Sequence, residues 1–162
     1  MVDVKGFTDL LDPPVYVVTA AADGRRAGCL VGFASQSSLH PVRFVVWLSK
    51  VNHTYGVACR ATHLGVHLLG REQHGLARLF GGESGDHVDK FASTRWEQGA
   101  HGVPVLADAC AWFVGRVEER GDWGDHVGFC LTPVDTGAVP LPRGEVLRLS
   151  DVVDLSPGHP AP

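Results

Sequence analysis

The sequence predicts a mainly β fold, an antiparallel barrel with two or three helices packed outside it. Twenty glycines and ten prolines punctuate short apolar runs, a pattern typical of many short strands. Turn-forming pairs such as Asp23-Gly24 separate neighbouring runs and indicate hairpins. The regular alternation of strands and helices that a doubly wound parallel sheet requires is missing from the sequence.

The bulk composition predicts a single globular domain in a reducing compartment. With 162 residues, we expect one domain over 1–155, followed by a disordered tail over 156–162. The formal net charge of −4, without a Lys/Arg cluster, argues against nucleic-acid binding. No apolar run is long enough for a membrane span, and the first residues lack a signal segment. Four widely spaced cysteines in apolar surroundings indicate buried thiols, so we expect a cytoplasmic protein.

The first half of the chain predicts a hairpin, a polar loop, a buried strand and a helix. The expected elements are a short helix near Phe7, strands over 15–20, 26–32 and 44–48, a loop over 33–42, and a helix over about 52–60. The loop is expected because its serines and Gln36 cannot fill a core. The run over 44–48 is continuously apolar, which indicates a strand buried on both faces. Asn52 is a suitable N-cap for the helix.

The second half predicts further strands around one amphipathic helix. The expected elements are a strand over 62–69, a helix over 71–80 ended by Gly81-Gly82, an irregular stretch over 83–100, a long hairpin over 106–134 turning at 120–122, and a last short strand over 146–149. His63 and His67 are four residues apart, which on a helix would suggest a metal pair. Their segment alternates with period two, so structural or surface histidines are favoured. Asp86, His87 and Asp89 lack a fourth ligand at a usual spacing, which favours a solvated loop and no metal site.

A polar hexad after the third predicted strand is the first candidate site. Ser49, Lys50, Asn52 and Thr54 offer short hydrogen-bonding groups and one ammonium, which together suit an anion, most simply a phosphate. A helix opening near Asn52 would add unpaired backbone N–H groups and the positive end of its dipole. We interpret this hexad as the phosphate end of a nucleotide-type cofactor site. The alternative is an ordinary polar turn with a helix cap.

His126 is the second candidate, at the start of the return strand of the long hairpin. It follows Gly124-Asp125, and its ordinary pKa near neutrality allows it to donate a hydrogen bond or a proton. The alternative is an exposed histidine in a turn. Signatures of P-loop enzymes, dinucleotide-binding βαβ units, α/β-hydrolases and zinc proteases are absent from the sequence, so a hydrolase or metal enzyme has little support.

Taken in order, these segments resemble the flavin reductase-like FMN-binding family. The resemblance covers about 15–134 and rests on an ordered set of motifs. They are Val-Tyr-Val-Val-Thr-Ala, Gly-Cys-Leu-Val-Gly-Phe-Ala-Ser-Gln-Ser-Ser-Leu-His-Pro, Ser-Lys-x-Asn-x-Thr, His-Leu-Gly-Val-His-Leu-Leu, Leu-Ala-x-Leu-Phe-Gly-Gly, Gly-x-Pro-x-Leu and Gly-Asp-His. It implies an antiparallel split β-barrel of Greek-key type and a homodimer that binds FMN, or alternatively FAD. The implied reaction is hydride transfer from NADH or NADPH to flavin, by a flavin reductase or by the reductase component that serves a partner oxygenase.

The resemblance also implies roles for individual residues. The loop with Phe33, Ala34, Ser35 and Gln36 would lie along the isoalloxazine ring. The hexad beginning at Ser49 would hold the phosphate and ribityl chain, with Lys50, Asn52 and Thr54 as direct ligands. Phe80 and Gly81 would lie near the flavin. His126, the catalytic candidate, would lie near the nicotinamide or the edge of the flavin ring.

One departure from the family pattern leaves a second interpretation open. Leu30, Gly32, Phe33 and Ala34 stand where family members often carry threonine and small polar residues. Ring contacts would then have to come from backbone N–H groups. The alternative is therefore a non-catalytic binder or carrier of flavin, deazaflavin or another planar cofactor such as haem.

Overall fold

The computed structural model describes residues 1–82, 89–142 and 144–154. The predicted tail over 156–162, and Asp86 and His87, lie outside these residues. Seven strands form one antiparallel sheet in the order β2-β1-β5-β8-β9-β4-β3. Their bounds are β1 (Tyr16–Ala22), β2 (Arg25–Val31), β3 (Ala34–Leu39), β4 (Val42–Ser49), β5 (His63–Leu68), β8 (Ala111–Asp122) and β9 (His126–Ala138). The predicted antiparallel, mainly β class is confirmed.

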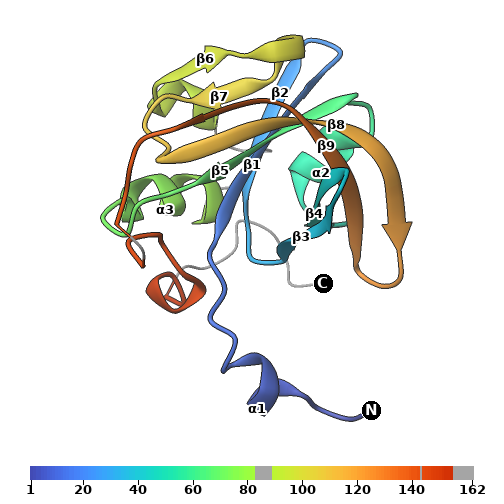
Figure 1. Cartoon of the computed structure of the whole chain (residues 1–162), viewed down its shortest axis with the longest axis vertical. Coiled ribbons are helices and arrows are strands. Elements are labelled where there is room, and N and C mark those ends of the chain that lie inside the picture. The colour runs from blue at the N-terminus through green and yellow to red at the C-terminus, as the bar shows by residue number, and fades with distance from the viewer. Residues whose placement is uncertain (83–88, 143, 155–162) are drawn as a thin grey trace.

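The sheet curls around a single apolar interior, as a split barrel does (Figure 1). Its edge strands β2 and β3 are consecutive in the chain, and the carbonyl of Phe33 between them accepts from the Trp47 N–H of β4 at 2.9 Å. Side chains from β1, β2, β4, β5, β9 and the helix α2 (His53–Ala58) meet inside, among them Leu48, Leu64 and Phe129. This bond extends the β3–β4 ladder to the point where the chain passes from β2 to β3, and the two edge strands do not pair with each other.

Two helices and a small ribbon cover the sheet, while α1 stands apart. Helix α3 (His74–Gly82) buries Ala77 and Phe80 in a second apolar cluster. The ribbon pairs β6 (Trp96–Gln98) with β7 (Pro104–Leu106), and short 3₁₀ turns span Lys90–Ser93, Ala100–Gly102 and Leu149–Asp151. The short α1 (Lys5–Thr8) lies at the end of an N-terminal arm and buries none of its residues (Figure 1). Among the described helices, none has the length and apolar character to cross a bilayer.

Two predictions for the segment before α2 were wrong. The expected loop over 33–42 contains β3, a strand at the sheet edge whose polar side chains are exposed or half-buried on both faces. The run over 44–48 is not buried on both faces, because β4 alternates. Val46 and Leu48 face the interior, whereas Trp47 is half-buried on the outside.

The last predicted strand is replaced by a closing segment. Residues 146–149 form only isolated bridges, although the Leu147 backbone bonds both Val15 and Leu69. Beyond it, Leu149 and Val152 fold back towards β1 and β2. The long hairpin is confirmed, but it turns at 123–125 and not at 120–122, since β8 continues to Asp122.

His67 is a structural histidine, as its alternation predicted. The ring is fully buried on β5. Its Nδ1 lies 2.9 Å from the Val17 carbonyl, and its Nε2 accepts from the Leu106 N–H at 3.1 Å. The Val17 bond requires a proton on Nδ1 and the Leu106 bond requires none on Nε2, so the neutral ring fits. Burial lowers the pKa of His67 to about 4. His63 stacks on His101 at 3.7 Å, and the described residues contain no group of three or more potential metal ligands.

Candidate functional site

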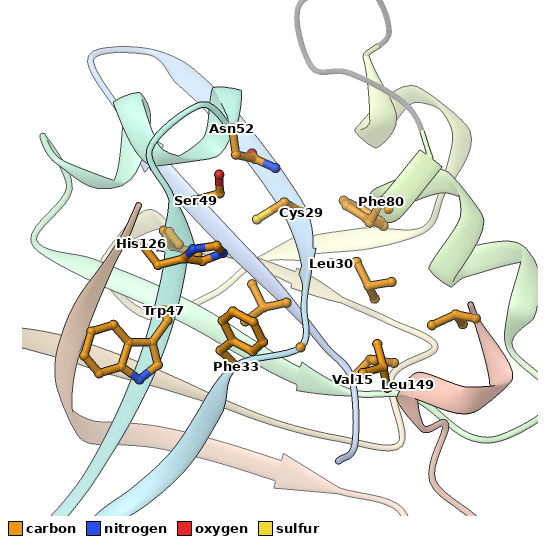
Figure 2. A pocket seen from close by; sticks show the side chains of 15 residues that line it. Val15, Cys29, Leu30, Phe33, Trp47, Ser49, Asn52, Phe80, His126 and Leu149 are labelled. Carbon is orange, nitrogen blue, oxygen red and sulfur yellow. The ribbon is translucent and has the colours of Figure 1, made fainter. Parts of the chain in front are cut away.

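A cavity of about 310 Å³ opens beside the ends of β2 and β4 (Figure 2). It is lined by Val15, Cys29, Leu30, Val31, Gly32, Phe33, Trp47, Leu48, Ser49, Asn52, Phe80, Gly81, His126, Leu149 and Val152. Strands β2, β4 and β9, helix α3 and the closing C-terminal segment all contribute. The walls are mostly apolar, and the polar side chains gather where β4 passes into α2.

The polar end of the cavity is formed by Ser49 and Asn52. Asn52 caps α2, its carboxamide oxygen accepting from the Thr54 N–H at 2.8 Å, which confirms the predicted N-cap. This bond leaves the amide nitrogen of Asn52 as the donor that its side chain can offer to a ligand. Ser49, the last residue of β4, has a buried hydroxyl with no hydrogen-bond partner among the described residues. Since buried hydroxyls are normally paired, Ser49 marks a place where a ligand would supply the missing bond.

His126 stands beside this polar end on the neighbouring strand. It pairs with Ser49 in the β4–β9 register, and its Nδ1 lies 2.7 Å from the Asp125 carboxylate. The Phe33 ring packs against the imidazole, with 4.9 Å between ring centroids (Figure 2). If Nδ1 donates to Asp125, then Nε2 is the nitrogen that can accept or exchange a proton with a ligand. Phe33 is 57% exposed, so an aromatic face remains open at the rim.

Cys29 forms part of the cavity floor. Burial raises the pKa of its thiol to about 11, although a hydrogen bond with the Thr54 side chain opposes this. Thr54 itself is only 1% exposed and does not line the cavity. The structure therefore places this predicted phosphate ligand beneath the floor, where it supports Cys29.

Other predicted ligands also lie outside the lining. The Lys50 ammonium pairs with Asp122 at 2.8 Å, and its backbone N–H donates to Asp125. The β3 residues follow the edge strand away from the cavity, and Gln36 borders a separate hollow beside Phe44. The structure brings together Phe33, Ser49, Asn52, Phe80, Gly81 and His126, and it leaves Ala34, Ser35, Gln36, Lys50 and Thr54 out of the lining.

Sequence reasoning missed several residues that shape this cavity. Lys90 is buried, and its ammonium donates to the carbonyls of Gly28 and Phe80, both at 3.0 Å. It therefore connects β2 to α3, and both of these elements contribute residues to the cavity lining. Leu149 and Val152 approach from the far end of the chain, and no local pattern indicates this. Trp47 lies on the outer face of β4, and the continuously apolar run over 44–48 gives no alternation that would indicate this.

The lining suits a molecule with a flat apolar head and a polar tail. Leu30, Phe33 and Leu149 give apolar walls, and Ser49 and Asn52 give hydrogen-bond donors at one end. The volume falls in the range of about 300–1,000 Å³ that is usual for small-molecule sites. A flavin has this division between ring and phosphorylated chain, so the residues present fit the predicted cofactor.

The chain is similar in sequence to several named reductases. It is 30% identical to a ferric-chelate reductase (NAD(P)H) of Archaeoglobus fulgidus, over 85% of this chain and 81% of that protein. It is 31% identical to the reductase component of a 4-nitrophenol 4-monooxygenase/4-nitrocatechol 2-monooxygenase of Rhodococcus opacus, over 76% of this chain and 65% of that protein. The chain spans only 40% and 50% of the length of two Rhizobium meliloti relatives, a probable flavin reductase and a stachydrine N-demethylase reductase subunit.

Solved structures and the family profile also point to flavin-binding proteins of this kind. An FMN-binding protein of Thermus thermophilus, solved with bound 1-cyclohex-2-enone, superposes with a TM-score of 0.78 at 25% identity, covering 85% of this chain and 77% of that one. The profile of the flavin reductase like domain matches residues 9–145. This match includes every strand of the sheet and nearly all of the cavity. The chain therefore belongs to the flavin reductase like domain family.

Proposed function

We propose that this protein binds FMN, or alternatively FAD, and reduces it with NADH or NADPH. The observation that carries this proposal is the Ser49 hydroxyl, which is buried at the polar end of an apolar cavity and has no hydrogen-bond partner among the described residues. The names of the family relatives support the reaction class, since they include reductases that use nicotinamide cofactors. Bound flavin would accept a hydride from the nicotinamide and pass the electrons on.

Several residues in and beside the cavity then have defined tasks. Ser49 and Asn52 donate hydrogen bonds to the phosphate or ribityl oxygens, and Phe80 and Leu30 pack against the flat ring. The Nδ1 of His126 lies 2.7 Å from the Asp125 carboxylate, which fixes the orientation of the imidazole. The ring orients the nicotinamide at the rim and can exchange a proton there through Nε2. Lys50 adds a positive charge near the phosphate when it exchanges Asp122 for that group. The apolar walls exclude water from the reacting ring.

We further propose a cytoplasmic homodimer that can supply reduced flavin to an oxygenase. The N-terminal arm exposes apolar side chains, including Phe7, Leu10 and Leu11, which a second copy would cover. The oxygenase partner is suggested by the relatives named as monooxygenase reductase components.

A second candidate function is binding without turnover. The ring-facing part of β2 offers Leu30 and Gly32, so few side-chain donors face a ring there. Such a wall would also accept a deazaflavin or haem, held by stacking and by backbone groups alone. The protein would then act as a carrier of a planar cofactor.

Anaerobic spectroscopy separates the two candidates. FMN is first titrated against the protein, and we expect its fluorescence to be quenched on binding. The loaded protein is then mixed with NADH or NADPH under nitrogen, and rapid bleaching of the flavin band is the result expected of a reductase. Persistent colour would favour the carrier, and an absence of quenching at high protein concentration would refute flavin binding itself.

A further inference from the structure

Two tryptophans, one from β4 and one from the β8–β9 turn, lie together on the outer face of the sheet next to the cofactor cavity. Trp47 of β4 and Trp123 of the hairpin turn lie with 5.5 Å between ring centroids. They border a second cavity of about 490 Å³, lined by Val45, Trp47, Glu119, Arg120, Gly121, Trp123, Gly128 and Cys130. Trp47 lines both cavities, so the second one begins where the cofactor cavity ends. We call these two indoles the tryptophan platform.

Two paired glycines allow the indoles to lie on the backbone. Gly121 and Gly128 are partners across the β8–β9 ladder, and Gly128 is also the partner of Trp47. A Cβ on Gly128 would lie 2.9 Å from the Trp47 ring, and one on Gly121 would lie 2.5 Å from the Trp123 ring. Any other residue at these positions would lift the rings off the sheet. The close approach of both rings to the backbone thus depends on the absence of two side chains.

The platform presents a large aromatic surface to solvent. Trp123 is 81% exposed, although an indole gains stability from burial. The two rings are tilted by 51° to each other, so a flat ligand would stack on the exposed Trp123 ring and meet Trp47 at an angle. Every nucleobase has a π-face suited to such stacking. A planar ligand would cover the surface that the chain itself leaves open.

The charged side chains at the platform restrict the chemistry of that ligand. The Arg120 guanidinium already donates to the Cys59 carbonyl at 2.7 Å. Glu119 borders the cavity and offers only acceptor oxygens when ionised. The site therefore favours a flat ring with an N–H donor, and it disfavours a phosphate. Adenine meets both conditions through its purine face and its exocyclic amine.

We propose that the tryptophan platform binds the adenine ring of a dinucleotide whose reactive ring occupies the neighbouring cofactor cavity or its rim. This inference rests on the proposed function. The adenine belongs either to FAD or to NAD(P)H, since both join adenine to a second ring through a pyrophosphate. Stacking on Trp47 and Trp123 would then decide whether the protein prefers FAD over FMN, or a dinucleotide reductant over a mononucleotide.

The test compares ligands with and without adenine on Trp123→Ala, Trp123→Phe and a control, Trp112→Ala. Trp112 is on the same hairpin and also lies over a glycine, Gly137, but at its other end. If FAD supplies the adenine, Trp123→Ala should raise the Kd for FAD about 5- to 150-fold and leave that for FMN unchanged. If the reductant supplies it, KM should rise for NADH and not for reduced nicotinamide mononucleotide. Trp123→Phe should restore most of the loss, and Trp112→Ala should show neither change.

Equal effects of Trp123→Ala on FAD and FMN, together with unchanged KM for NADH, would overturn the proposal. A change of oligomeric state in sedimentation, with both nucleotide preferences unchanged, would assign the platform to contact between copies. ADP provides a probe that is independent of flavin chemistry, and we expect it to quench the tryptophan fluorescence of the wild type but not of Trp123→Ala. Failure of both FMN and FAD to bind the wild type would refute the proposed function, while this ADP result would still test the platform.

Discussion

Replacing Ser49 with alanine should change protein stability and flavin affinity in opposite directions. In the protein without ligand, the Ser49 hydroxyl is buried and has no partner among the described residues. Its desolvation is a cost, so Ser49→Ala should raise the free energy of unfolding by up to about 1–3 kcal/mol. On the proposed function, the same hydroxyl would donate to the phosphate of bound FMN, and its loss should cost about 1.5–3 kcal/mol of binding. The Kd for FMN should therefore rise about 10- to 150-fold.

Two measurements and one control variant check this reasoning. Urea unfolding without flavin gives the stability change, and fluorescence titration gives the affinities for FMN and riboflavin. Riboflavin lacks the phosphate, so an effect confined to FMN assigns the bond to that group. Ser37→Ala, an exposed serine of β3, should change either quantity by less than about 0.5 kcal/mol. A Ser49→Ala protein that is less stable and binds FMN as tightly as the wild type would refute the assignment of a ligand bond to Ser49.

Further predictions concern Lys50, His67 and Lys90. Lys50→Ala should weaken FMN by about 1.5–3 kcal/mol and riboflavin little, and equal effects on both ligands would contradict a phosphate contact. His67 has a pKa lowered from 6.5 to about 4, so the unfolded chain binds the proton first as the pH falls. Stability should thus be full above pH 6.5 and fall by up to about 3 kcal/mol towards pH 4 in urea titrations, a slope that His67→Gln should flatten. Lys90→Met should lower the free energy of unfolding by about 1–3 kcal/mol for each carbonyl that it leaves unpaired. The control Lys5→Met, at an exposed position, should change it little. Equal free energies of unfolding for Lys90→Met and the wild type would show that the Lys90 hydrogen bonds are dispensable.

The sequence predicted those parts of the fold that depend on local chemistry. Asp23-Gly24 marked the first turn, and Asn52 marked the start of α2, because turn and cap residues act through bonds to their own neighbours. The edge strand β3 was missed because its side chains face solvent on both sides, so no apolar alternation is required. Its polar composition resembles that of a loop.

The sequence predicted those residues of the candidate site that lie close together in the chain. Ser49 and Asn52 belong to one hexad and line the same cavity. Leu149 and Val152 reach that cavity through tertiary folding, and nothing in their own segment indicates this. Lys90 was missed for a related reason. The carbonyls that accept from its buried ammonium come from β2 and α3, so nothing in the sequence around Lys90 indicates that it is buried.

Cys29 lies on the floor of a cavity in which, on the proposed function, reduced flavin would meet oxygen and form peroxide. Only the thiolate of cysteine reacts readily with peroxide or with alkylating reagents. With a pKa of about 11, roughly one Cys29 in ten thousand is ionised at neutral pH. Burial of Cys29 therefore slows its oxidation by peroxide that forms in the cavity.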